Sequence, residues 1–442
     1  MTVRFTRSAL ASALLMLSLS NAAWAHDIVP GAAQTKPILL TDATLHTASN
    51  GVLAGHDILM ENGKITAIGV DLAAPANAEV ISMQGKHIYP GLVALINQLG
   101  LIEIEAVRAT DDTHEVTAFN PDVRASIAFN ADSEVIPTIR RNGFSYSLVY
   151  PKGSLLMGQS ALVQLDSWTY EDALVHDGVG LHVRWPNASL IAPWWNKKTP
   201  EELAKDNQNA LAQLESWFAA ARAYGEARAQ GNDRGLDSRL EAMQPVLAGK
   251  RPVFVHADDE RQIRQAMLFA KTQRLQLVIV GGRDSWRVAS ELAAAKVPVV
   301  FTAPYGIPER DDEPSNVAYR TPALLQKAGV TFALSLDGYW DTRNVVFGAG
   351  QAISYGLTPE QALQSVTINA ARIAGVEQKL GSLEVGKAAT VVVSSGDIFD
   401  YLTHQVSDMW IDGRKVDLNN RHQQLHDKYQ QRYQQLDQAA AK

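Results

Sequence analysis

The sequence contains no cysteine among its 442 residues. The chain can therefore form no disulfide, and no thiolate can act as a nucleophile or as a metal ligand. Any metal site must use histidine, aspartate, glutamate or a modified lysine. The formal net charge of -7 is small for this length. Since no basic stripe is present to neutralise phosphates, we expect no nucleic acid as a partner.

Long apolar segments are also missing. Arg4 and Arg7 precede a short apolar core, Ala9–Leu19, and the small-x-small sequence Ala23-Trp24-Ala25 follows it. This order is typical of a secretory signal peptide over residues 1–25, cleaved near Ala25. The apolar core is shorter than the about 20 residues that cross a bilayer. We therefore expect an exported protein, periplasmic or secreted, that does not enter a membrane.

The two ends of the mature chain are predicted to be β structure. Residues 26–90 contain short apolar runs and turns, and Asn62-Gly63 is a strong hairpin signal because both residues tolerate positive φ. Residues 376–417 have the same character. Residues 418–442 are rich in glutamine and predict a polar helical tail.

Residues 91–375 alternate between apolar strand runs and helical stretches. The runs are continuous, as expected for parallel strands that are buried on both faces. Repeated β–α units of this size predict a doubly wound sheet or a (β/α) barrel, and the pattern alone does not choose between them. The predicted strands are Leu92–Ile96, Ser145–Tyr150, Val253–His256, Leu275–Val280, Val297–Phe301 and Thr331–Leu336.

A helical insertion is predicted at about 187–245. Thr199-Pro200-Glu201-Glu202 predicts a helix start, with threonine as N-cap, proline at the first helical position and glutamate closing a capping box. Trp194 and Trp195 lie just before it. Two interpretations remain open, a helix packed on the exterior of the α/β domain and a lid over a ligand.

A set of short motifs is spread over nearly the whole mature chain: Gly85–Leu92, Glu115–Arg124, Asn142–Tyr146, Pro151–Gln159, Pro252–Ala257, Leu357–Ala362, Val366–Arg372, Gly381–Lys387 and Ile411–Val416. In their order these motifs resemble the amidohydrolase superfamily, especially its imidazolonepropionase-like and dihydroorotase-like branches. The resemblance implies a (β/α)8 TIM barrel over 91–375. It also implies a small β-sandwich domain formed from both chain ends.

The resemblance further implies one or two divalent metals, usually zinc, at the C-terminal ends of the barrel strands. The expected ligands are a His-x-His pair on the first strand, a lysine or glutamate on the fourth, and one histidine each on the fifth and sixth. An aspartate on the eighth strand doubles as general base. Here the first-strand pair reads Ile96-Asn97-Gln98, and Gly281 stands at the sixth-strand position. Ile96 cannot bind a metal, and Gln98 offers only a carbonyl oxygen.

Three of the implied site residues remain. His256 stands at the fifth-strand position and Asp337 at the eighth, where it could be base, ligand or a residual structural acid. His182 stands near the fourth-strand position, as a ligand or as a hydrogen-bonded core or rim histidine. A full zinc site contributes about 10–16 kcal/mol, so losing three ligands at about 3 kcal/mol each weakens affinity about a millionfold. We therefore expect the metal to be lost or weakly bound.

Two functions are compatible with this sequence. The first is an exported hydrolase of C–N bonds in non-peptide or cyclic amides, with Asp337 as the catalytic base and His256 as ligand or acid. The alternative is a catalytically inactive pseudoenzyme that binds a small molecule or partners an active amidohydrolase paralogue. Homo-oligomers are also expected, because members of this superfamily often form them.

Overall fold

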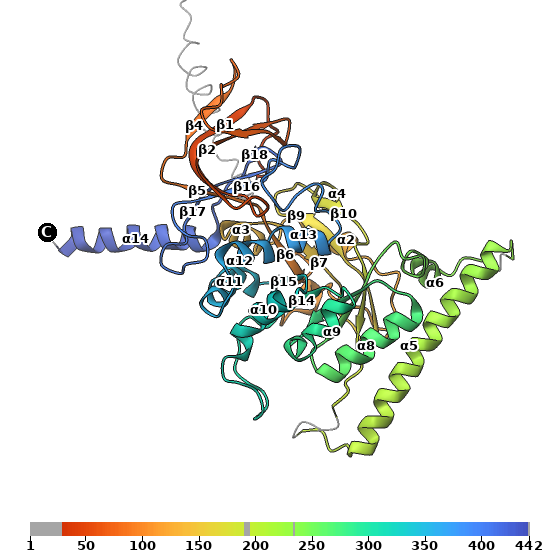
Figure 1. The fold of residues 1–442 in the computed structure, drawn as a ribbon. Helices are drawn as coiled ribbons and strands as arrows, with labels where there is room; N and C mark the ends of the chain where they lie inside the picture. Colours follow the sequence, from red (N-terminus) through yellow and green to blue (C-terminus); the bar gives the residue numbers. More distant parts are fainter. Residues whose placement is uncertain (1–28, 190–194, 233–234, 441–442) are drawn as a thin grey trace, which may run out of the picture.

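The computed structural model describes residues 29–189, 195–232 and 235–440 of this α/β protein (Figure 1). The predicted signal peptide and Trp194 lie outside the described residues. Within these three ranges, no helix combines the length and the apolar character that a membrane crossing requires.

Strands from both chain ends pair in one eight-stranded sheet, with the order β18-β17-β16-β5-β1-β2-β3 and β4 beside β1. Strand β16 pairs antiparallel with β5, so the C-terminal strands extend the N-terminal ones (Figure 1). Asn62 and Gly63 form the two-residue turn between β2 and β3 with φ of 50° and 74°, which confirms the hairpin prediction. The strands are β1 Ile38–His46, β2 Val52–Glu61, β3 Lys64–Gly69, β4 Glu79–Ser82, β5 His87–Pro90, β16 Val391–Ser394, β17 Val406–Ile411 and β18 Arg414–Lys415.

The middle of the chain forms two further sheets, with the orders β10-β9-β7-β6 and β15-β14-β13-β12-β11-β8. Strands β11 to β15 are parallel to one another. Only Ser160 separates β8 from β9, so this one segment joins the two sheets. The strands are β6 Leu92–Asn97, β7 Phe144–Val149, β8 Leu156–Gln159, β9 Ala161–Gln164, β10 Leu174–His176, β11 Leu181–Arg184, β12 Val253–Ala257, β13 Leu277–Gly281, β14 Val299–Phe301 and β15 Phe332–Leu334.

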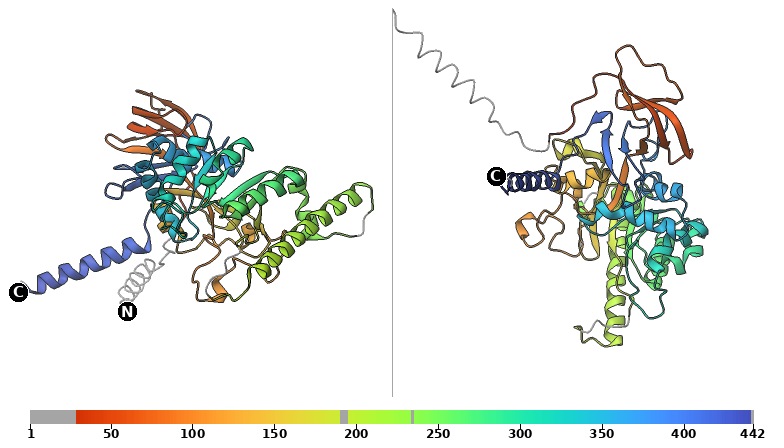
Figure 2. Two further views of the ribbon diagram at one scale, coloured as in Figure 1. Left: turned by 60° about the horizontal axis from the view of Figure 1, so that its bottom comes forward. Right: turned by 90° about the vertical axis from the view of Figure 1, so that its left-hand side faces the viewer.

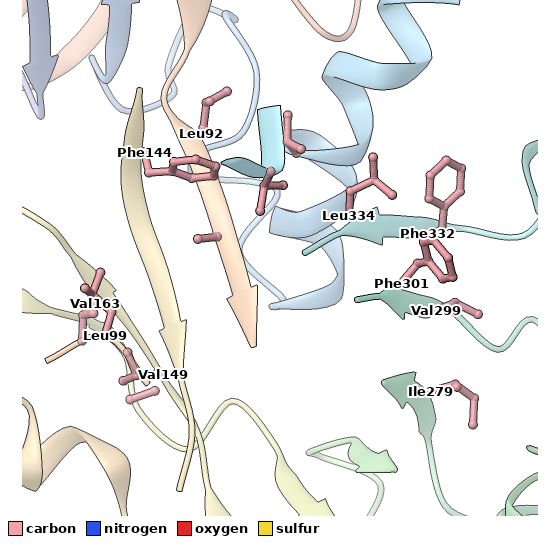
Figure 3. Close-up of a cluster of buried hydrophobic side chains, with 14 of the residues drawn as sticks. Leu92, Leu99, Phe144, Val149, Val163, Ile279, Val299, Phe301, Phe332 and Leu334 are labelled. Carbon is pink, nitrogen blue, oxygen red and sulfur yellow. The ribbon is translucent and has the colours of Figure 1, made fainter. Parts of the chain in front are cut away.

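Alternate side chains of these two sheets enter two different cores. One core lies between strands and helices and includes Phe144, Ile279, Phe301 and Phe332 (Figure 3). The other takes side chains from strands of both sheets, including Val93, Leu148, Phe254, Val280, Val300 and Ala333. The outer strands β6 and β15 are linked by the Ser335 hydroxyl, which donates to the Leu95 carbonyl. Each sheet is therefore buried on both faces, and the second core is an interior that the two sheets share. Burial on both faces explains the continuous apolar runs of the sequence.

Helices cover the outside of these sheets, and α5 and α14 extend away from the body (Figure 2). Helix α5 begins with the predicted capping box between Thr199 and Glu202 and buries Leu214, Phe218 and Ala221. The helices are α2 Ala125–Ala128, α3 Ile136–Arg141, α4 Tyr170–Ala173, α5 Pro200–Ala229, α6 Ser238–Ala242, α7 Gln244–Leu247, α8 Glu260–Gln273, α9 Ala289–Ala294, α10 Val317–Ala328, α11 Val345–Ser354, α12 Pro359–Ser365, α13 Ile368–Ile373 and α14 Arg421–Ala440.

A buried ion pair connects the α/β region to the eight-stranded sheet. The Arg140 guanidinium donates to the Asp166 carboxylate at 2.7 Å, and both side chains are almost fully buried. Arg414 of β18 donates to the other carboxylate oxygen at 3.0 Å. Because one carboxylate accepts from a guanidinium of helix α3 and from one of strand β18, Asp166 links the α/β region to the eight-stranded sheet.

Candidate active site

A cavity of about 580 Å³ opens at the carboxyl ends of the parallel strands. Arg184 and Gly281 end β11 and β13, and Asp337 lies in the loop after β15, which ends at Leu334. In α/β folds this end of the strands is where ligands bind, because the loops that follow the strands converge there. Seven of the residues that line the cavity carry the argument below: Ile96, Tyr150, Arg184, His256, Asp258, Gly281 and Asp337.

The end of β6 presents no metal ligand to this cavity. Ile96 lines the cavity wall and has φ of 56°, a conformation that a β-branched residue rarely adopts. Asn97 accepts from the Leu99 backbone and from the Ser147 hydroxyl. Gln98 is 1% exposed, and neither polar atom of its amide has a hydrogen-bond partner among the described residues. The sequence stretch expected to hold two histidines is thus apolar at one position and an unpartnered amide at the other.

The two remaining histidines contact each other. The Nδ1 atom of His182 lies 3.0 Å from the Nε2 atom of His256. Burial, with a smaller contribution from Arg184, lowers the pKa of His256 to about 3. Burial and the neighbouring His256 also lower the pKa of His182 well below its usual value. Both rings are therefore neutral at neutral pH, and one ring donates to the other.

His182 lies behind the cavity wall rather than in it. Its side chain is fully buried and stacks on Phe254 and on Tyr150, with ring centroids 4.8 Å apart in both pairs. Its Nε2 atom has no hydrogen-bond partner within the described part of the chain. Its assignment as a metal ligand stays a prediction, while His256 and Asp337 share the cavity wall.

Tyr150 follows β7 directly and lies among the site residues. Its ring centroid is 4.8 Å from that of His182 and 4.9 Å from that of His256. Burial raises the pKa of the Tyr150 phenol far above its usual value, and the nearby Asp337 carboxylate adds to this shift while Gln98 opposes it. The hydroxyl therefore remains protonated, close to both Asp337 and Gln98.

Asp258 takes the space beside Gly281. A Cβ atom added to Gly281 would lie 2.5 Å from the Asp258 Oδ1 atom, closer than non-bonded atoms approach. The backbone N–H of Arg283 donates to the same carboxylate at 3.3 Å. Asp258 lines the cavity, yet protein atoms surround its carboxyl on most sides, and this burial raises its pKa. Asp337 raises the pKa of Asp258 further.

Arg184 supplies the positive charge of the cavity. Its Nε atom donates to the Gly153 carbonyl at 2.9 Å, which fixes the guanidinium at the mouth. The rest of the side chain is exposed. A guanidinium held in this way can bind a carboxylate or carbonyl oxygen of a ligand.

The comparisons with known proteins agree on one family. The sequence model of the Amidohydrolase family matches residues 241–416. An amidohydrolase from Thermotoga maritima MSB8 has a similar structure, with a TM-score of 0.76 and 26% identity over 86% of this chain and 99% of that one. Residues 241–416 match the Amidohydrolase family, and these similarities together support the amidohydrolase superfamily for this chain.

Curated amidohydrolases match over shorter or more distant stretches. The imidazolonepropionase of Symbiobacterium thermophilum is 33% identical over 147 residues, which is 32% of this chain. The amidohydrolase tasK of Hapsidospora irregularis is 23% identical over 405 residues, which is 81% of this chain. The chain spans only 33% and 39% of the length of these two relatives.

Amidohydrolases are typically metal-dependent, so a metal ion would be expected among the residues of this cavity. Across the described residues, no group of three or more histidine, aspartate or glutamate side chains could hold a metal ion. The facing nitrogens of His182 and His256 are occupied with each other. The residues present therefore do not fit the metal that the superfamily implies.

Three cavity residues were not identified from the sequence, namely Tyr150, Arg184 and Asp258. Arg184 and Asp258 each stand two positions after a predicted site histidine, so they follow the same strands into the loops. The spacing of two residues from a predicted site histidine could therefore have identified Arg184 and Asp258 from the sequence. Tyr150 has no such signal, because a tyrosine at the end of a buried strand is ordinary core material.

Proposed function

We propose that this amidohydrolase hydrolyses a C–N bond of a small amide or cyclic amide bound in the cavity at the strand ends. The observation that carries the proposal is that Asp258 and Asp337 line one cavity and that burial raises the pKa of Asp258. A carboxyl group with a raised pKa is suited to act as the acid beside a second carboxyl group that acts as the base. The names of two relatives, an imidazolonepropionase and an amidohydrolase, support this class of bond.

The reaction would need only groups of this chain and water. Asp337 takes a proton from a water molecule as the water oxygen bonds to the carbonyl carbon of the substrate. Asp258, whose pKa is raised by burial, donates its proton to the nitrogen as the C–N bond breaks. Arg184 orients the substrate through an oxygen atom.

The wider setting of this activity is also part of the proposal. We propose that the two sheets of the α/β region form a TIM barrel, supported by the core they share and by the Ser335–Leu95 hydrogen bond. We propose export to the periplasm or beyond, supported by the sequence pattern that ends at Ala25. The natural substrate would then be a small extracytoplasmic amide.

A second candidate is a non-catalytic protein that binds a small molecule in the same cavity. The neutral, mutually bonded pair of His182 and His256 favours this candidate, because neither ring is free to act as a metal ligand at the facing nitrogens. Such a protein could partner an active amidohydrolase paralogue or form a homo-oligomer.

A substrate screen with matched variants tests the two candidates. The chain starting at His26 would be purified and supplied with hydantoin, imidazolone and dipeptide substrates, with product formation as the readout. Hydrolysis that Asp337→Asn lowers about 10²–10⁴-fold supports the proposed activity. Asp132→Asn, at an exposed carboxylate, is the control and should not change turnover. Unchanged turnover in Asp337→Asn contradicts the mechanism, and saturable binding without turnover favours the second candidate.

A further inference from the structure

The ring of Tyr150 occupies the centre of the predicted metal site. It stacks on His182 and lies tilted against His256, at the fourth- and fifth-strand ligand positions. Its hydroxyl lies close to Gln98 and Asp337, at the first- and eighth-strand positions. A single aromatic side chain, 2% exposed, thus contacts or approaches four of the predicted ligand positions.

The remaining ligand position on the sixth strand is filled by Asp258. An ideal Cβ at Gly281 would approach the Asp258 Oδ1 atom to 2.5 Å, so no side chain fits there while Asp258 keeps its place. Asp258 is held from two sides, because the Arg283 N–H binds its carboxylate and the Asp284 N–H binds its backbone carbonyl at 2.8 Å. The sixth-strand position therefore carries glycine instead of histidine, and Asp258 takes up the space that a side chain at this position would need.

We infer that Tyr150 and Asp258 fill the position expected for the family's metal, so that this position is closed to a metal ion by the chain's own side chains while the cavity beside it stays open. A site that had only lost ligands would leave a polar hollow between the remaining groups. Here the aromatic ring of Tyr150 packs against both histidines, and close-packed contacts of this kind leave no room for an additional ion between these side chains. This exclusion of the metal does not depend on whether the protein hydrolyses its ligand or only binds it.

Weak metal binding can have two causes here, the missing histidine ligands or the side chains that fill the metal position. If missing ligands alone were responsible, restoring the histidines at positions 96 and 98 would restore binding. If Tyr150 fills the site, the histidines alone would not be sufficient. Histidine tolerates positive φ better than isoleucine does, so position 96 accepts this change in its backbone conformation.

The experiment therefore compares three sets of variants. The first is Ile96→His with Gln98→His, the second adds Tyr150→Ala, and the third adds Tyr150→Phe instead. Zinc binding would be measured by competition with a chromophoric chelator, and cobalt(II) absorption would report the ligand geometry. We expect zinc to bind at least about tenfold more tightly in the Tyr150→Ala set than in the other two. The Tyr150→Phe set keeps the ring and should resemble the double-histidine variant.

Two results would overturn the inference. The first is one equivalent of tightly bound zinc in the double-histidine variant or in the unchanged protein, because Tyr150 would then not exclude a metal. The second is equal zinc affinity in the Tyr150→Ala and Tyr150→Phe sets when circular dichroism shows both to be folded.

If Tyr150→Ala does not fold, Tyr150→Val replaces it. The same gain in zinc affinity is expected, and equal affinity to the Tyr150→Phe set would again contradict the inference. Tyr150→Ala alone should gain no zinc, since position 96 would still be isoleucine. All of these readouts are independent of turnover, so they can fail or succeed separately from the proposed hydrolysis.

Discussion

The Nδ1 atom of His182 and the Nε2 atom of His256 lie 3.0 Å apart, on neighbouring parallel strands. One ring must donate and the other accept, which requires that the accepting ring is neutral, and the lowered pKa values of both histidines make both rings neutral at neutral pH. Tyr150 and Phe254 enclose the His182 ring on its faces. This pair therefore contributes to the core as a neutral hydrogen-bonded unit, and its properties can be measured without knowing a substrate.

Replacing His182 by alanine should destabilise the protein by about 2–5 kcal/mol, because it leaves a cavity in the core and removes the partner of His256. The free energy of unfolding in urea measures this effect. His426→Ala, at an exposed histidine of α14, is the matched control and should change stability by less than about 0.5 kcal/mol. Equal effects of the two substitutions would show that the pair does not stabilise the core.

Stability should fall as the pH drops below the usual pKa of histidine. The folded-state pKa values of His182 and His256 are both lowered, so the unfolded chain binds more protons between the folded value for His256, about 3, and the usual value near 6.5. The contribution is complete above the usual value and is lost as the pH falls toward the folded value. Urea unfolding at neutral and at mildly acidic pH measures the slope. His182→Gln removes one titrating ring and should have a shallower slope; an identical slope would contradict this assignment.

The purified protein should hold less than one equivalent of tightly bound zinc. The described residues offer no group of three metal-binding side chains, and each missing ligand weakens zinc binding by about 3 kcal/mol. Elemental analysis after dialysis against a weak chelator measures the zinc content. One or two equivalents of retained zinc would show that the site is complete in a way that these side chains do not indicate.

Asp258→Asn should lower any hydrolysis by about 10²–10⁴-fold, because the proposed proton donor is removed. In the unchanged protein, turnover should decline as the pH rises through the raised pKa of Asp258, since the acid must be protonated to donate. The pH profile of kcat measures both effects. An unchanged alkaline limb in Asp258→Asn would assign the proton donation to another group.

Asp166→Asn should cost about 3–5 kcal/mol of stability, because it leaves the buried Arg140 guanidinium without a counter-charge. Arg414 loses the same partner. The exposed pair of Lys36 and Glu79 offers the control, and Lys36→Met should cost less than about 1 kcal/mol. Urea unfolding compares the two substitutions. A cost for Asp166→Asn no greater than the control value would mean that the buried carboxylate of Asp166 does not stabilise the fold through Arg140 and Arg414.

Much of the fold could be predicted from the sequence because local rules govern it. All six apolar runs contain or overlap strands, from β6 at Leu92–Asn97 to β15 at Phe332–Leu334. The Asn62-Gly63 turn and the capping box at Thr199 depend only on a few adjacent residues. The bent segment through β8 and β9 was not predicted, since pairing with two different sheets is a property of the whole arrangement.

The candidate site divides in the same way. The sequence by itself determined which ligand types stand at the ends of the strands, with Ile96, Gln98 and Gly281 where histidines were expected. Only the tertiary structure decided what fills the space between them, because Tyr150 and Asp258 reach the site from other loops. Packing depends on the relative positions of residues far apart in the chain, and no local pattern encodes the distance between two side chains that meet only after folding.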